Sequence, residues 1–139
     1  MLRFLRESLI IFSLTGLGAA FSLLNGLAPR PWLQPELAAG EIRGGDAGVL
    51  DPLWVDARSQ TDYDAAHIPQ AILLNEDNWD DQINDLIGAW LTDPRPIVVY
   101  CSSESCGTSK RVATRLREAL PDAEIYSLKG GWEHGYSRL

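Results

Sequence analysis

Four short apolar runs mark the chain beyond residue 50. They read LWV at 53–55, AILL at 71–74, IVVY at 97–100 and IYSL at 125–128. None of them alternates apolar with polar residues, which is typical of strands that are covered on both faces. Such strands occur almost only in parallel sheets with helices on either side, so the runs predict an α/β domain.

Two segments between these runs have apolar residues at helical spacing, from about 78 to 91 and from about 109 to 120. Pro121 ends the second segment, because proline interrupts the hydrogen bonds of a helix. Strands that alternate with helices predict a doubly wound parallel sheet, flanked by helices and joined by right-handed crossovers. No internal repeat is visible.

The segment before the domain carries no charge over 22 residues, from 8 to 29. At about 1.5 Å per residue it is long enough to cross a hydrocarbon core of about 30 Å. Arg3 and Arg6 precede it, and positive charge is kept on the cytoplasmic side of a membrane. We therefore predict a single-pass transmembrane helix within residues 1–29, which contacts the membrane through residues 8–29 and places the domain on the extracytoplasmic (periplasmic) side.

A cleaved signal peptide is the alternative for this segment. Gly18 and Ala20 are small enough to precede a cut that would leave Phe21 as the first residue. In either case residues 30–40, with Pro31 and Pro35, form an extended linker, and residues 41–139 form the domain. Both alternatives export the domain.

The composition argues against a nucleic acid partner and against a metal site. The net charge is −7, the pI is near 4.7, and no basic patch alternates with aromatic residues, so we expect no nucleic acid partner. Two cysteines are too few for a disulfide scaffold or for a zinc site built on thiolates. We expect neither a metal nor another cofactor.

Both cysteines lie in one loop, YCSSESCGTSKR, at 100–111. Cys101 directly follows a predicted strand, and open α/β sheets bind their ligands at the carboxyl ends of strands. The helix that follows the loop presents unpaired N–H groups and its positive dipole end, which stabilise an anion. Such surroundings lower the pKa of a thiol from about 8.5 to about 3.5–7.5 in documented cases, so Cys101 is predicted to be a reactive thiolate.

Other chemistries fit this loop less well. The two cysteines are separated by four residues, unlike the C-x-x-C spacing of thioredoxin-like redox sites. Gly107 is the only glycine in the loop and no lysine lies within it, which excludes a phosphate-binding P-loop. The remaining alternative is that both cysteines are small apolar fillers.

Three segments together resemble the rhodanese-like (sulfurtransferase) family: LWVDARSQTDYDAAHIPQAILLN, IVVYCSSESCGTSKRVATRL and IYSLKGGWEHGY. The resemblance implies that Cys101 accepts a sulfane sulfur as a persulfide and passes it to a nucleophilic acceptor. It also implies that the loop backbone cradles the persulfide. The cradling residues are Ser102, Ser103, Glu104, Ser105, Gly107 and Thr108.

The same resemblance assigns structural roles to five residues outside the loop. Arg58 is expected to pair with a carboxylate near the rim of the domain, and His67 to fix a turn rather than to transfer protons. Gly130 and Gly131 are expected to form a tight turn below the loop. Asp56 completes this structural motif.

The loop also departs from the family. It is longer than usual and contains Glu104 but no basic residue, which disfavours anionic donors such as thiosulfate. The missing arginine also argues against the related phosphatases and arsenate reductases. Cys106 is either a resolving thiol that closes a disulfide with Cys101 or a residue that shapes the loop.

The sequence thus predicts a membrane-anchored, extracytoplasmic rhodanese-like sulfurtransferase with Cys101 as the catalytic residue. Its sulfur donor and thiol acceptor are not identified by the sequence. A dithiol oxidoreductase that uses Cys101 and Cys106 with a membrane redox partner is one alternative. A non-catalytic rhodanese-like binding module is the other, and the presence of Cys101 speaks against it.

Overall fold

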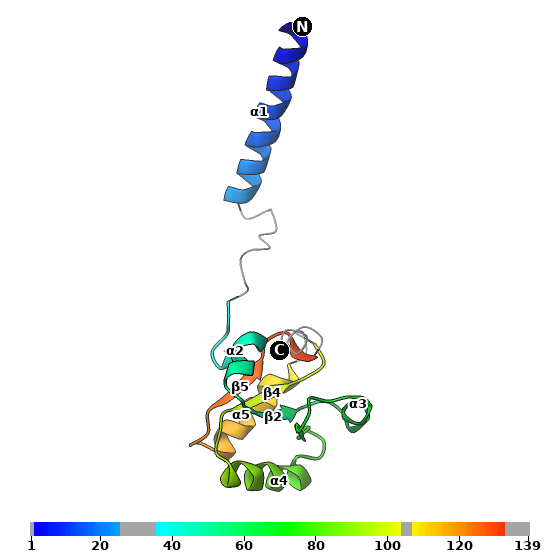
Figure 1. Ribbon diagram of the computed structural model, residues 1–139, viewed down its shortest axis with the longest axis vertical. Coiled ribbons are helices and arrows are strands. Elements are labelled where there is room, and N and C mark those ends of the chain that lie inside the picture. Colours follow the sequence, from blue (N-terminus) through cyan, green and yellow to red (C-terminus); the bar gives the residue numbers. More distant parts are fainter. Residues whose placement is uncertain (1, 26–35, 104–106, 133–139) are drawn as a thin grey trace. The chain divides into compact units, whose positions relative to one another are not determined.

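The computed structural model describes residues 2–25, 36–103 and 107–132. The chain divides into two compact units, Met1–Glu36 and Leu37–Leu139. Helix α1, Leu2–Leu24, makes up nearly all of the described part of the first unit (Figure 1). Its residues Arg6–Leu24 have a mean hydropathy of 1.7 and are long and apolar enough to cross a membrane.

Thr15 is a polar residue in the middle of α1. The hydroxyl of Thr15 donates to the carbonyl oxygen of Ile11 at 2.8 Å, so it is satisfied within the helix. The predicted span of residues 8–29 overlaps α1 as far as Leu24, and its last four residues lie outside the described part of the chain.

The second unit is built on a five-stranded parallel sheet with the order β1-β5-β4-β2-β3. Its strands are β1 Glu41–Ile42, β2 Leu53–Asp56, β3 Ile72–Leu73, β4 Ile97–Tyr100 and β5 Ile125–Leu128. The parallel α/β fold predicted from the apolar runs is confirmed. Strand β1 was not predicted, because two residues, one of them charged, give no apolar run.

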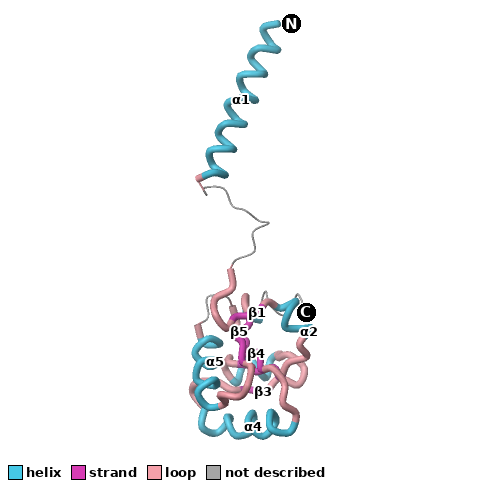
Figure 2. The backbone as a smooth tube through the Cα atoms, turned by 90° about the vertical axis from the view of Figure 1, so that its left-hand side faces the viewer, coloured by secondary structure: helices cyan, strands magenta, loops and turns pink. Residues whose placement is uncertain are grey.

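Helices cover both faces of this sheet, and Figure 2 shows the strands between α5 on one side and α2 on the other. The helices of the domain are α2 Gly44–Val49, α3 Gln60–Ala65, α4 Trp79–Thr92 and α5 Thr108–Ala119. The two longer helices, α4 and α5, match the predicted ones to within two residues at each end.

The core explains why the apolar runs do not alternate. In β4, Ile97 and Val99 pack against α4 and α5, whereas Val98 and Tyr100 pack on the opposite face. All four residues are buried, so each face of the strand needs apolar side chains. Hydrophobic burial on both faces fixes β4 in the centre of the domain.

The register of the sheet decides where the site lies. Asp56 at the end of β2 is opposite Tyr100 at the end of β4, and the backbone N–H of Ala57 donates to the carbonyl oxygen of Tyr100 at 2.9 Å. The segments that follow β2 and β4 therefore leave the sheet side by side. One begins with Ala57 and Arg58, and the other begins with Cys101.

Candidate active site

Cys101 lies between the end of β4 and the start of α5. Its Sγ is 3.4 Å from Oγ of Ser109, the second residue of α5, and 3.5 Å from the carbonyl oxygen of Ser103. Only 2% of Cys101 is exposed. A thiol at this place can donate a hydrogen bond, and a thiolate can accept one from the Ser109 hydroxyl. The N-terminus of α5 adds its positive dipole end, which favours the thiolate.

A cleft of about 270 Å³ opens beside this sulfur. It is lined by Ala57, Arg58, Ser59, Asp62, Asn75, Glu76, Asp77, Cys101, Ser102 and Thr108. The lining comes from the segments after β2, β3 and β4 and from the start of α5, so the sheet brings together residues that are far apart in sequence. Cys101 thus forms part of the wall of this cleft.

The predicted loop residues are described only in part. Ser102 and Thr108 line the cleft, and Ser103 and Gly107 adjoin them in the chain. Glu104, Ser105 and Cys106 lie outside the described residues. The predicted contact between Cys101 and Cys106 therefore stays a prediction.

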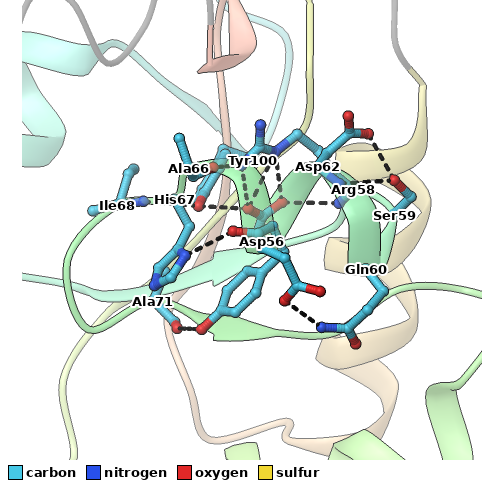
Figure 3. A network of polar contacts seen from close by, with 12 residues as sticks. Asp56, Arg58, Ser59, Gln60, Asp62, Ala66, His67, Ile68, Ala71 and Tyr100 are labelled. Carbon is cyan, nitrogen blue, oxygen red and sulfur yellow. Dashed lines mark hydrogen bonds and ion pairs between the residues drawn. The ribbon is translucent and has the colours of Figure 1, made fainter.

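A network of polar side chains supports the ends of β2 and β4 (Figure 3). The buried carboxylate of Asp56 accepts hydrogen bonds from the Tyr100 hydroxyl at 2.7 Å, from the Arg58 backbone N–H at 2.9 Å and from the Arg58 guanidinium at 2.7–3.1 Å. The guanidinium also donates to the carbonyl oxygen of Ala66. This network links the two segments that carry the site.

The partner of Arg58 confirms the predicted pairing with a carboxylate and corrects its place. Arg58 was expected to pair with a carboxylate near the rim, but its partner is Asp56, whose side chain has no exposed surface. The physical reason is that a buried carboxylate needs donors, and Arg58 follows Asp56 by two residues, close enough to supply both a backbone N–H and a guanidinium. Asp56 is fully buried, and Arg58 extends from it to the lining of the cleft.

Burial and charge shift the pKa values of this network. Burial raises the pKa of Tyr100 well above its usual range, and the hydrogen bond to Asp56 adds to that effect. Burial lowers the pKa of Arg58, but the Asp56 carboxylate outweighs this and holds that pKa above its ordinary value. Tyr100 therefore stays protonated and remains a hydrogen-bond donor.

The predicted glycine turn contacts the cysteine directly. Gly130 and Gly131 have φ angles of 88° and 59°, which glycine adopts readily. The backbone N–H of Trp132 donates to the carbonyl oxygen of Cys101 at 2.7 Å. A Cβ atom on Gly131 would lie 2.6 Å from that oxygen, so only glycine fits there without a shift of the loop.

We predict that Gly131→Ala reduces the reactivity of Cys101 and destabilises the domain by about 1–3 kcal/mol, because the added Cβ meets loop backbone and the φ angle is strained. Alkylation rate and urea denaturation measure the two effects. Gly88→Ala in α4 is the matched control, since its Cβ would meet nothing within 4 Å. Equal behaviour of the two variants would contradict the role given to the turn.

His67 lies outside the cleft lining. Its Nδ1 is 2.8 Å from the carbonyl oxygen of Tyr63, and the two rings stack with their centroids 3.9 Å apart. The Tyr63 hydroxyl in turn donates to the carbonyl oxygen of Ala71 at 2.6 Å. These contacts hold the turn between α3 and β3. Over the described ranges, no group of three or more His, Cys, Asp or Glu residues is arranged to hold a metal ion.

Three supporting residues were not predicted from the sequence. Tyr100 had been assigned only to a strand, although a polar hydroxyl within an apolar run is a signal that a buried partner is needed. Trp132 lies with its ring 4.6 Å from the Arg58 guanidinium and 5.9 Å from the Tyr100 ring. Glu76 pairs with Arg111 across 35 residues, a contact that no local pattern indicates.

Comparison with known proteins gives one family match. The rhodanese-like domain family matches residues 35–137. A protein of Bacillus halodurans of known structure is 23% identical, with a TM-score of 0.54 over 70% of this chain and 71% of that one. A protein of Staphylococcus saprophyticus is 19% identical, with a TM-score of 0.50 over 67% and 89% of the two chains. At these identities the two structures support the fold alone. No match was found among curated proteins.

Proposed function

The chain belongs to the rhodanese-like domain family, and from this premise we propose that it is a membrane-anchored sulfurtransferase in which Cys101 carries the sulfur. One observation supports this most directly. A cysteine stands at the carboxyl end of β4, beside the N-terminus of α5, and lines a cleft of about 270 Å³. A binding module needs no nucleophile at that place.

The proposed reaction has two steps at Cys101. The thiolate attacks the sulfane sulfur of a donor, a new S–S bond forms, and the donor's remaining group leaves with the electron pair of the broken bond. A nucleophilic thiolate acceptor then attacks the outer sulfur of the Cys101 persulfide. The persulfide bond breaks, its electron pair returns to Cys101, and the acceptor leaves as a persulfide.

Residues around the sulfur can assist both steps. The Ser109 hydroxyl, 3.4 Å from Sγ, can donate to the thiolate that starts and ends the cycle. The positive end of the α5 dipole stabilises the same charge. The hydrogen bond from Trp132 to the Cys101 carbonyl oxygen holds the backbone in place.

Mass spectrometry of the purified protein tests this function. After incubation with a sulfane sulfur donor, the Cys101 peptide should gain about 32 Da, one sulfur atom, and should lose that mass when a thiol acceptor is added. A loss of about 2 Da across the peptides of Cys101 and Cys106 would instead indicate a disulfide and favour the dithiol oxidoreductase. If the mass of the Cys101 peptide is unchanged with every donor, the result would favour the non-catalytic binding module.

The membrane part of the proposal has its own test. Arg3 and Arg6 precede the apolar part of α1, so we propose that the N-terminus is cytoplasmic and the domain extracytoplasmic. A reporter enzyme that works only outside the cytoplasm, fused after Leu139, should be active. Activity confined to a cytoplasmic reporter would refute this topology, and a mature N-terminus at Phe21 would identify a signal peptide.

A further inference from the structure

The cleft beside Cys101 has an uneven charge. Among the residues that the structure describes, three carboxylates line it, those of Asp62, Glu76 and Asp77, together with one guanidinium, that of Arg58. That guanidinium already has a counter-charge, because it is bound to the buried carboxylate of Asp56. With that pair and the pair of Glu76 with Arg111 set aside, Asp62 and Asp77 give the described lining a net negative charge.

Glu76 forms an ion pair with a second cation, the guanidinium of Arg111. Its carboxylate accepts two hydrogen bonds from the Arg111 guanidinium, at 2.9 and 2.7 Å. Arg111 is on α5 and also donates to the side chain of Thr108 at 3.0 Å, so it lies next to the cleft without lining it. The Arg111 guanidinium holds the pKa of Glu76 below its usual range, which keeps Glu76 ionised. Glu76 and Arg111 thus compensate each other's charge, and without Glu76 the Arg111 guanidinium would lose this counter-charge beside the cleft.

Two electrostatic effects act at different depths of the site. At the sulfur, the N-terminus of α5 favours an anion such as a thiolate or a persulfide. At the entrance, the carboxylates repel an anion before it reaches that point and attract a cation. The cysteine is thus activated, while the molecules that meet it are selected by charge.

We propose that the sulfur acceptor is a small aminothiol, a thiol with a protonated amine a few bonds away, and that Glu76 is the main determinant of this preference. This inference rests on the proposed function. The volume of about 270 Å³ suits a small molecule. The ammonium group faces the carboxylates while the thiolate attacks the outer sulfur of the Cys101 persulfide, which needs no oxidant or reductant.

Methanethiosulfonate reagents that differ in charge measure the potential at Cys101 without any sulfur transfer. We would compare 2-aminoethyl, methyl and 2-sulfonatoethyl methanethiosulfonate, which are cationic, neutral and anionic. Each forms a mixed disulfide with the thiolate and releases methanesulfinate. Rates on the full-length protein are taken from the mass of the Cys101 peptide and divided by the rate with 2-mercaptoethanol in solution, which removes intrinsic differences between the reagents.

In the wild type the cationic reagent should react about tenfold faster than the anionic one at low salt, and about twofold faster near 0.5 M salt. Glu76→Gln should abolish or reverse this preference, because it removes a carboxylate and leaves Arg111 beside the cleft entrance. The double variant Glu76→Gln/Arg111→Gln should regain part of the preference for the cationic reagent, because it also removes the guanidinium that Glu76 compensates in the wild type. Glu118→Gln is the matched control, since Glu118 is an exposed carboxylate of α5 that does not line the cleft.

A second measurement separates this inference from the proposed function. Persulfide-loaded protein is mixed with cysteamine, 2-mercaptoethanol or 3-mercaptopropionate. The rates of sulfur loss, each divided by the rate of the same thiol with a small-molecule persulfide in solution, should fall in that order. Equal normalised rates of the three reagents in the wild type, or no change in Glu76→Gln, would overturn the charge selection. If the reagents show the preference but none of the thiols takes sulfur, the selection stands and the transferase assignment fails.

Discussion

Cys101→Ser is expected to abolish sulfur transfer, lowering the rate by about a thousandfold or more. A serine hydroxyl is hardly ionised near neutral pH and cannot hold a sulfane sulfur in a persulfide. The substitution changes one buried atom, so the fold should persist. The measurement is single-turnover transfer from a sulfane sulfur donor to a thiol, followed together with the mass of the protein.

Cys106→Ser is the matched control, because it makes the same atomic change at the only other cysteine of the chain. We expect Cys106→Ser to retain sulfur transfer in a single turnover. It should lose more activity over repeated turnovers under oxidising conditions, where a resolving thiol would matter. Wild-type transfer by Cys101→Ser would refute the assignment of the catalytic residue. Complete loss in both variants and both assays would make the two thiols one redox unit.

The fold was predictable where hydrophobic burial leaves a pattern in the sequence. Strands β2, β4 and β5 are buried on both faces, so their residues form apolar runs that can be recognised in isolation. Helix α3 contains no buried residue, and α2 is a six-residue segment with three glycines. Neither has an apolar stripe, so no periodic signal predicts them. Their positions follow from the chain connections around the sheet.

The candidate site was predictable in its centre and not in its surroundings. The position of Cys101 follows from local order, a strand and then a loop and then a helix, which the sequence shows directly. The partners of Arg58 and Arg111 depend on where the sheet brings distant segments together. Arg111 meets Glu76 only because α5 starts beside the segment that follows β3. Such contacts are properties of the tertiary structure.

The network around Asp56 carries the second large prediction. Asp56→Asn is expected to lower the free energy of unfolding by about 3 kcal/mol, because it removes the counter-charge of a guanidinium that is only 7% exposed. For a domain of about this size the melting temperature should fall by roughly 10 °C or more. Thermal and urea denaturation of the full-length protein in detergent micelles measure both values. Transfer at Cys101 should also slow below the melting temperature, since Asp56 binds Tyr100, the residue next to the cysteine.

Two further variants test whether the loss of stability in Asp56→Asn comes from the buried charge or from the loss of any carboxylate. Asp93→Asn removes the exposed carboxylate of a pair with the partly buried Arg95, which keeps Asp51 as a second partner, and should cost less than about 1 kcal/mol. Arg58→Gln combined with Asp56→Asn should regain part of the lost stability, because no uncompensated charge then remains in the core. The coupling between the two sites is read from a double-mutant cycle with both single variants. Two results would contradict this role of the buried pair at the ends of β2 and β4. One is an equal loss of stability in Asp56→Asn and Asp93→Asn. The other is a double variant whose loss of stability is the sum of the losses in Arg58→Gln and Asp56→Asn.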